Sequence, residues 1–286
     1  MDMSLGSRLP GKELRPALHA RCLLVRCGHP EPSVAREHGC FAAWFRRVID
    51  PRVELDVVDI RTEPFVPSRL DGVGAVMVTG SPHSVYDPHP WLASLDALVR
   101  EAVLVRAIPY LGVCFGHQAL AQACGGEVAK NPRGREMGTI PVALNPMGRQ
   151  SPLFDGLTDV FDAQATHCDT VVRPPPGARV LAASAKDDCQ AFTLGTAWGV
   201  QFHPEVTAEV LRGYVRARAE RLRTEGIDPD TLHDAIRDTA AGRRIVDNFL
   251  SMAFGLTPEA DRPAVEQSTL QTAGPMGNAP MECGGS

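Results

Sequence analysis

The 286-residue sequence contains no apolar run long enough to cross a membrane, and its first 19 residues lack the apolar core of a secretory signal. Lys and Arg are not gathered into a basic stripe, and the net charge of -5 is mild, which argues against nucleic-acid or membrane partners. The eight cysteines are scattered, without the spacing of a disulfide framework. Four of them lie in apolar runs, as reduced thiols do: Cys22, Cys27, Cys114 and Cys124. We therefore expect a cytoplasmic protein without membrane or nucleic-acid partners.

The composition is that of an ordinary globular protein, with 44% hydrophobic and 22% charged residues. Apolar runs of strand length alternate with segments whose apolar residues have helical spacing. The predicted strands are 20–27, 53–60, 75–79 and 108–113, and the predicted helices are 34–49 and 91–106. This alternation predicts an α/β fold: a three-layer sandwich whose mostly parallel central sheet is covered by helices on both faces.

The pattern changes after the fourth strand. Short β-like runs punctuated by Gly and Pro indicate hairpins added beside the main sheet: 139–144, 160–165, 170–172, 179–183, 190–194 and 197–202. Two further helices are predicted, over 208–223 and 230–254. The second belongs to an extension over about 228–255, which packs on the sheet or docks a partner; we favour packing on the sheet.

These patterns give one domain over 20–256 with a loose end on each side. The first 19 residues are predicted to form a flexible arm. The segment 257–286 is polar and rich in small residues, which predicts a disordered tail.

Cys114 lies where a predicted strand runs directly into a predicted helix of small residues. Gly112 and Gly116 stand two residues before and after it, as in the turn that exposes a nucleophile at the edge of a sheet. The N-terminus of the following helix favours a thiolate over a thiol. The alternative is a small buried cysteine in a core strand, which is the commonest environment of free cysteine.

His203, Pro204 and Glu205 follow the apolar strand 198–202. Because the proline favours an extended conformation at His203, residues two apart can point to the same side. Glu205 can then orient the imidazole toward a thiol, as the third member of a catalytic triad does. The alternative is a polar residue at the end of a strand, with Glu205 beginning a helix.

Four ordered motifs resemble the class I, triad-type glutamine amidotransferase family. They are GSPHSVYD (80–87), GVCFGHQ (112–118), THCD (166–169) and GVQFHPE (199–205). The SVYD loop and the GREMG segment (134–138) are most similar to the glutaminase domain of GMP synthase. The resemblance covers residues 22–214 and implies the same α/β fold.

The resemblance also implies roles for individual residues. Cys114 is expected to form a γ-glutamyl thioester, with His203 as general base and acid and Glu205 as its orienting partner. The backbone N–H groups of Gly80, Ser81 and Phe115 are expected to form the oxyanion hole. The residues expected to hold the glutamine substrate are Gln118, His167, Cys168 and Asp169.

No Gly-rich phosphate loop such as GxxxxGK[ST] is present, so we expect no ATP use by this chain and no cofactor. The resemblance then implies a free-standing glutaminase that releases ammonia from L-glutamine for a separate ATP-dependent synthetase. The alternative is a stand-alone γ-glutamyl peptide hydrolase with the same Cys-His-Glu triad. A regulator without activity is disfavoured by the intact triad. His83, Asp87 and His89 have a spacing that fits no common ligand set, so no metal is expected.

Overall fold

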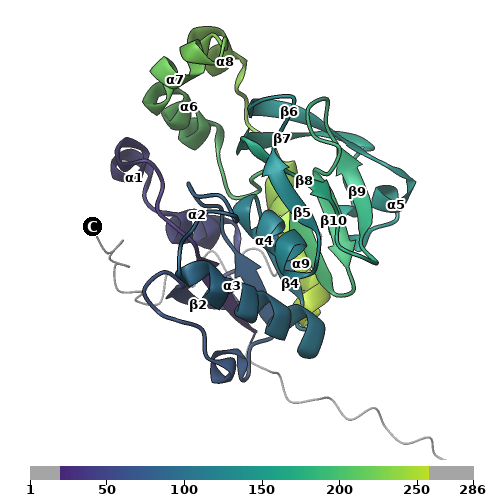
Figure 1. Ribbon diagram of the computed structural model, residues 1–286. Coiled ribbons are helices and arrows are strands. Elements are labelled where there is room, and N and C mark those ends of the chain that lie inside the picture. The colour runs from purple at the N-terminus through teal and green to yellow at the C-terminus, as the bar shows by residue number, and fades with distance from the viewer. Residues whose placement is uncertain (1–19, 258–286) are drawn as a thin grey trace, which may run out of the picture.

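The computed structural model describes residues 20–257. The predicted arm over 1–19 and the predicted tail beyond Thr257 lie outside the described residues. Within them, the chain forms one large sheet with helices on both faces and a small second sheet (Figure 1).

Eleven strands are formed by the described residues, nine of them in the large sheet and two in the small one. The large sheet has the order β2-β1-β3-β4-β11-β10-β9-β6-β7. Its strands are β1 (Arg21–Arg26), β2 (Glu54–Asp59), β3 (Ala75–Val78), β4 (Tyr110–Val113), β6 (Glu136–Leu144), β7 (Val160–His167), β9 (Arg179–Ala183), β10 (Ala191–Leu194) and β11 (Ala197–Val200). The small sheet pairs β5 (Glu127–Lys130) with β8 (Asp169–Arg173).

The pairing direction changes across the large sheet. Strands β2, β1, β3, β4 and β11 are mutually parallel, whereas every pairing from β11 to β7 is antiparallel. The predicted parallel centre with added hairpins is therefore confirmed. One strand was missed: β5 has a single strongly apolar residue, Val128, and becomes a strand by pairing with β8.

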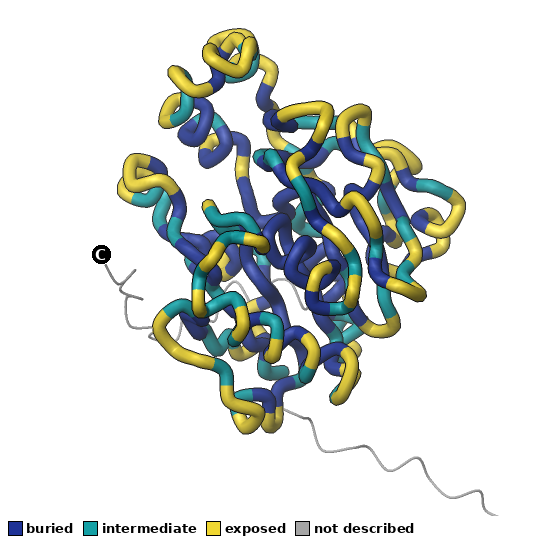
Figure 2. The backbone as a smooth tube through the Cα atoms, in the orientation of Figure 1, coloured by how far each residue is buried: buried dark blue, intermediate teal, exposed yellow. Residues whose placement is uncertain are grey.

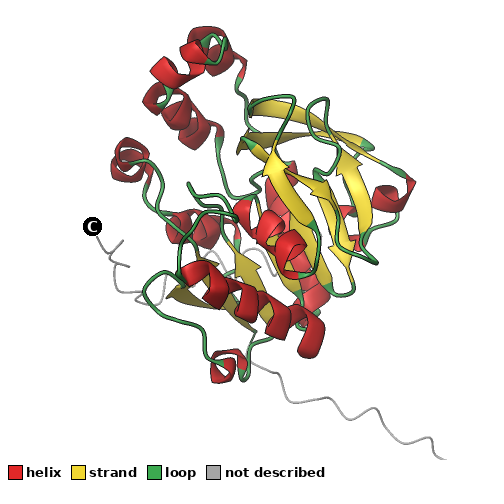
Figure 3. Ribbon diagram, viewed as in Figure 1, coloured by secondary structure: helices red, strands yellow, loops and turns green. Residues whose placement is uncertain are grey.

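The helices of the described residues are α1 (Pro32–His38), α2 (Phe41–Val48), α3 (Trp91–Arg100), α4 (Phe115–Ala123), α5 (Pro146–Arg149), α6 (Ala208–Ala217), α7 (Ala219–Thr224), α8 (Pro229–Ala235) and α9 (Ala241–Phe254). Helices α3 and α4 lie in front of the sheet in Figure 3 and α9 lies behind it. None of the helices between residues 20 and 257 combines the length and apolar character needed to cross a membrane.

Alternation along β1 separates two hydrophobic cores, one on each face of the sheet. Cys22 and Leu24 pack with α2 and α9, whereas Leu23 and Val25 pack with α3 and α4. The deepest residues follow the parallel strands and α4, and the turns between elements are exposed (Figure 2). The three-layer α/β architecture expected from the sequence is thus confirmed.

Three predicted helices are each interrupted. The helix expected over 34–49 breaks at Gly39, whose φ of 84° ends α1 before α2 begins. The helix expected over 208–223 breaks at Arg218, between α6 and α7.

The helix expected over 230–254 is also wrong as a single element, because α8 and α9 are separated by 236–240. The side chains of Thr139 and Gln164 donate hydrogen bonds to the carbonyl of Arg237, at 3.2 and 2.7 Å. These bonds from the sheet replace the helical hydrogen bond at this carbonyl. Helix α9 packs on the sheet through Ile245 and Phe249, as favoured from the sequence.

Candidate active site

Cys114 occupies a strained turn between β4 and α4. Its φ of 51° and ψ of -99° lie in a region that residues with a Cβ rarely adopt. Such a conformation costs about 1–3 kcal/mol and persists only where the surrounding structure enforces it. The N–H of Cys114 donates a 2.8 Å hydrogen bond to Val200 of the neighbouring β11, which ties the turn to the sheet.

Gly112 and Gly116 allow this turn because no side chain would fit at either position. A Cβ on Gly112 would lie 2.2 Å from the carbonyl oxygen of Gly116. A Cβ on Gly116 would lie 2.4 Å from the carbonyl oxygen of Val78, at the end of β3. The two glycines therefore let α4 begin directly against the carboxyl ends of the strands.

The imidazole of His203 is buried and held by Glu205. Nδ1 of His203 lies 2.8 Å from the carboxylate of Glu205, and Nε2 has no hydrogen-bond partner among the described residues. Burial alone would lower the pKa of His203, but the negative charges of the Glu205 carboxylate and the Cys114 thiolate outweigh it and raise that pKa from 6.5 to about 10. The ring is thus poised to carry a proton at neutral pH.

The structure brings Cys114 and His203 together at Gly80. A Cβ placed on Gly80 would lie 3.0 Å from Cε1 of His203 and 3.8 Å from Cβ of Cys114. Both side chains line the same cavity of about 240 Å³. They come from the carboxyl ends of adjacent parallel strands, β4 and β11, the edge at which open α/β sheets bind ligands.

Backbone N–H groups without a hydrogen-bond acceptor belong to residues beside Cys114. The N–H groups of Gly80 and Ser81 donate no hydrogen bond within residues 20–257. Phe115 is the first residue of α4, where an N–H has no acceptor within its own helix. The Ser81 hydroxyl donates to the carbonyl of Cys27 at 2.8 Å and so fixes the loop that presents two of these groups.

Asp169 is anchored on the wall of a second cavity of about 260 Å³. Its carboxylate accepts hydrogen bonds from Ser84 at 2.5 Å and from Tyr86 at 2.9 Å. Gln118 donates to the carbonyl of Asp169 at 3.2 Å and to Gln201 at 2.9 Å. The loop after β3 and the turn between β7 and β8 are therefore locked together beside the nucleophile.

His167 and Cys168 lie in different environments, although they are neighbours in the sequence. The ring of His167 is buried, with Nε2 3.0 Å from the carboxylate of Glu136 and Nδ1 3.0 Å from the carbonyl of Asp169. Cys168 is half-buried and lines the second cavity. His167 also lines this cavity, and its ring holds the backbone carbonyl of Asp169.

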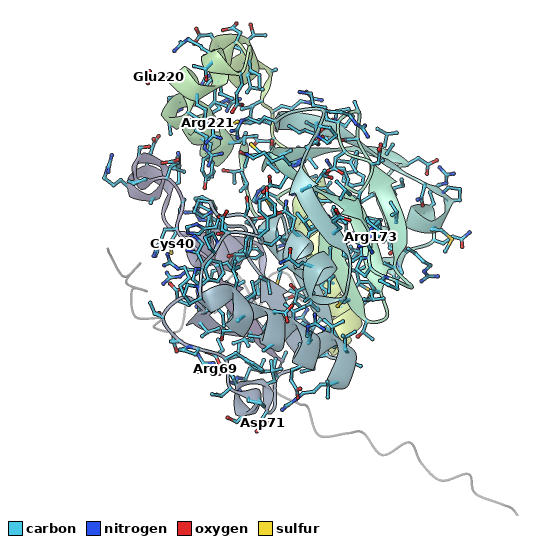
Figure 4. The ribbon with its side chains drawn as sticks, viewed as in Figure 1. Cys40, Arg69, Asp71, Arg173, Glu220 and Arg221 are labelled. Carbon is cyan, nitrogen blue, oxygen red and sulfur yellow. The ribbon has the colours of Figure 1, made fainter. Side chains whose placement is uncertain are left out.

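A basic rim, which the sequence analysis did not find, surrounds the second cavity. Arg221 extends from α7 beside this cavity (Figure 4). Members of this rim come from segments far apart in the chain: Lys130, Arg135, Arg218 and Arg221. No local motif relates these residues, because only the packing of α6 and α7 against the β5–β8 region brings them together.

Arg218 is the member of the basic rim that lines both cavities. It donates to the hydroxyl of Thr166 at 2.8 Å, and its guanidinium lies 4.5 Å from the centre of the Tyr214 ring. Burial lowers the pKa of Arg218, although a guanidinium stays charged at neutral pH. Arg218, which has Glu31 3.9 Å away, therefore places positive charge in both cavities that Cys114 lines. Arg135 and Arg221 instead form ion pairs with Glu225.

Within residues 20–257, one group of side chains brings three potential metal-ligating atoms together. The group is His83, Asp87 and His89, and its donor atoms lie within 4.8 Å of one another. They belong to the loop that carries Ser84 and Tyr86. The spacing of these residues in the sequence gave no reason to expect a metal there.

Comparison with known proteins identifies similar chains. The sequence model of the family described as glutamine amidotransferase class-I matches residues 38–216. A segment of 144 residues is 35% identical to the glutamine-hydrolysing GMP synthase of Pyrobaculum aerophilum, covering 50% of this chain and 26% of that protein. A longer segment of 227 residues is 31% identical to the corresponding enzyme of Aeropyrum pernix, covering 79% of this chain and 36% of that protein. The match thus spans about a quarter to a third of these relatives.

Solved structures are also similar. A glutamine amidotransferase of Thermotoga maritima has a TM-score of 0.67 and 25% identity, with 83% of this chain and 99% of that chain covered. A glutamine amidotransferase of Methylobacillus flagellatus has a TM-score of 0.65 and 24% identity, with 84% and 96% covered, and supports the fold alone.

Proposed function

The chain belongs to the class-I glutamine amidotransferase family, and we propose that it hydrolyses the side-chain amide of L-glutamine to glutamate and ammonia. The observation that carries this proposal is the convergence of Cys114, His203 and Glu205 at one sheet edge. Cys114 would be the nucleophile, His203 the base and Glu205 the carboxylate that orients the base. These are the three groups that thioester chemistry uses.

In the proposed first step, the Cys114 thiolate attacks the γ-carbonyl carbon of glutamine. The N–H groups of Gly80, Ser81 and Phe115 stabilise the oxyanion that forms, because they are fixed before the substrate arrives. Protonated His203 then donates its proton to the leaving nitrogen, which departs as ammonia and leaves a γ-glutamyl thioester.

In the second step, water attacks the thioester. Neutral His203 removes a proton from that water, and the thiolate of Cys114 departs as glutamate forms. The Glu205 carboxylate fixes the ring through Nδ1, so that Nε2 faces the reacting atoms. The proton balance closes because the proton that His203 gives away in the first step is recovered in the second.

The second cavity is the proposed site for the glutamyl part of the substrate. Gln118, His167, Cys168 and Asp169 line this cavity and would contact the substrate, and His167 would also hold the carbonyl of Asp169. The positive charge of Arg218 and the rest of the basic rim suits the α-carboxylate of an amino acid.

A second candidate is the hydrolysis of γ-glutamyl peptides, for which the pair of cavities provides a specific reason. Cys114 lines both, so the thiol is open to space on two sides. The first cavity has apolar walls from Phe41 and Tyr214 and could hold a leaving amine larger than ammonia.

The test compares ammonia release from glutamine with amine release from γ-glutamyl peptides, each with purified protein alone. Faster turnover of a peptide would favour the second candidate. Slow glutamine turnover that rises when an ATP-dependent synthetase is added would support the proposed release of ammonia to a partner. If neither substrate releases ammonia or amine, or if the release persists in Cys114→Ala, both candidate functions are refuted.

A further inference from the structure

The loop between β3 and α3 brings two imidazoles and a carboxylate to one point. Nδ1 of His83 lies 3.1 Å from Nε2 of His89. A carboxylate oxygen of Asp87 lies 4.0 Å from the first nitrogen and 3.9 Å from the second. Three donor atoms on separate side chains therefore form a small triangle.

The aromatic side chain of Trp91 holds both imidazoles in place. His89 stacks on Trp91 with 5.9 Å between ring centres and an interplanar angle of 17°. His83 meets the same indole edge-on, at 5.8 Å. The two rings are thus oriented by packing, and about a third of each imidazole side chain is exposed to solvent, which leaves the triangle accessible to an ion.

The Asp87 carboxylate is oriented by the turn of the loop. The N–H of Ser84 donates to Oδ2 of Asp87 at 2.8 Å, and the N–H of His89 donates to the carbonyl of Asp87 at 2.8 Å. Oδ2 is also the oxygen that lies within 4.0 Å of both imidazole nitrogens, and Oδ1 accepts no hydrogen bond from the residues between 20 and 257.

The spacing of the three donors fits a tetrahedral ion. Donors bound to zinc at about 2.1 Å lie about 3.4 Å apart. The observed separations of 3.1, 3.9 and 4.0 Å lie on either side of that value. Small rotations of half-exposed side chains would therefore complete the site, with a fourth position open to water. A hydrogen bond between the imidazoles of His83 and His89 explains why their nitrogens are 3.1 Å apart. It does not explain why the carboxylate of Asp87 lies close to both imidazoles.

We propose that His83, Asp87 and His89 bind a divalent cation of the zinc class. Two neutral imidazoles and one carboxylate are ligands that zinc, cobalt and nickel accept, whereas magnesium and calcium require oxygen donors. The bound ion would fix the loop that carries Ser84, whose hydroxyl holds Asp169 on the cavity wall. Occupancy of the site is thereby linked to the shape of the glutamine cavity.

The test uses the chain with Cys114→Ala, because the catalytic thiol and His203 could themselves bind zinc. Chelator-stripped protein is titrated with zinc in competition with a chromophoric chelator. One equivalent of zinc is expected to bind, and His83→Ala or His89→Ala in the same background should weaken it at least tenfold. His233→Ala removes a half-buried histidine that also lies beside an aspartate, at 3.2 Å, and should leave zinc binding unchanged.

Two further readings keep the result interpretable. Melting temperatures in excess chelator show whether each variant folds. Under saturating zinc the melting temperature should rise by about 5 °C in the Cys114→Ala protein and should not rise in the His89→Ala variant. Cobalt should give visible absorption without a thiolate charge-transfer band. A thiolate band, equal zinc affinity in the His89→Ala variant, or no binding at micromolar zinc would each overturn the proposal.

Discussion

The carboxylate of Glu205 lies 2.8 Å from Nδ1 of His203, and both side chains are buried. Pro204 and Glu205 form a turn in which the N–H of Val206 donates to the carbonyl of His203 at 3.5 Å, so a turn brings the two side chains together, and not the extended backbone expected from the sequence. The pair leaves Nε2 as the ring nitrogen directed at the thiol side of the cavity. This contact fixes the orientation of the imidazole and, together with Cys114, raises its pKa.

Glu205→Gln should reverse the effect of pH on the contribution of His203 to stability. The folded pKa of His203 is raised from 6.5 to about 10, so its contribution is complete below pH 6.5 and is lost as the pH rises through 10. Without the carboxylate, burial should dominate and lower that pKa. The melting-temperature difference between the two proteins should therefore be largest near pH 6 and smallest above about pH 10. A difference that grows with pH would contradict this.

Cys114→Ala should reduce glutamine hydrolysis by at least about 10⁴-fold, because the nucleophile is lost. In the unaltered protein, an electrophilic glutamine analogue should modify Cys114. Burial raises the pKa of Cys124 to about 11, so that thiol should react slowly, and Cys168 should not be the site of the adduct. Peptide mass spectrometry locates the label. Hydrolysis that survives in Cys114→Ala would remove the triad assignment.

Cys114→Gly should be more stable than Cys114→Ala by about 1 kcal/mol, because glycine relieves the strain at φ 51° while gaining freedom in the unfolded chain. Cys124 provides the matched control. Its φ is -98°, so Cys124→Gly should be less stable than Cys124→Ala. Urea unfolding measures all four variants, and the same order at both positions would refute strain at the nucleophile.

Gly112→Ala should destabilise the protein by about 3 kcal/mol or more, since the new methyl group would meet the backbone of α4. Gly195→Ala is the comparison, because φ there is 60° but no atom lies within 4 Å of the added Cβ. That substitution should cost only about 1 kcal/mol. Equal costs in urea unfolding would show that α4 does not depend on contact with Gly112.

Tyr86→Phe should raise the KM for glutamine several-fold and change kcat less, because the lost hydroxyl holds Asp169 rather than the reacting atoms. Thr158→Ala is the control: its hydroxyl bonds only to Val160, at the opposite end of β7 from His167. Steady-state kinetics separates the two parameters. A fall in kcat with unchanged KM would place Tyr86 in the chemical step instead.

Much of the fold and the core of the site were predictable because their signals are local. The parallel strands are continuous apolar runs, and Gly112 and Gly116 on either side of Cys114 predict the turn there. The likeness to the glutamine amidotransferase family supplied the pairing of that turn with His203. Helix ends were less predictable, since the carbonyl of Arg237, between α8 and α9, accepts its hydrogen bonds from the distant strands that carry Thr139 and Gln164.

Other parts of the site exist only in the folded chain. Ser84 and Tyr86 were recognised as part of a motif, but their bonds to Asp169 join segments 83 and 85 residues apart. The basic rim is likewise assembled from distant elements. His83 and His89 are six residues apart and meet because the turn at Asp87 folds the loop back on itself.

The N–H of Cys114 donates a hydrogen bond to the carbonyl of Val200, so the distance between β4 and β11 sets the separation of the Cys114 thiol and the His203 imidazole. Neither the thiol nor the imidazole depends on the movement of a loop, so local unfolding at the surface leaves the distance between them unchanged. Amide protons of β4 and β11 should consequently exchange only through global opening. On heating, the enzymatic activity should then be lost in the same cooperative transition in which the sheet unfolds.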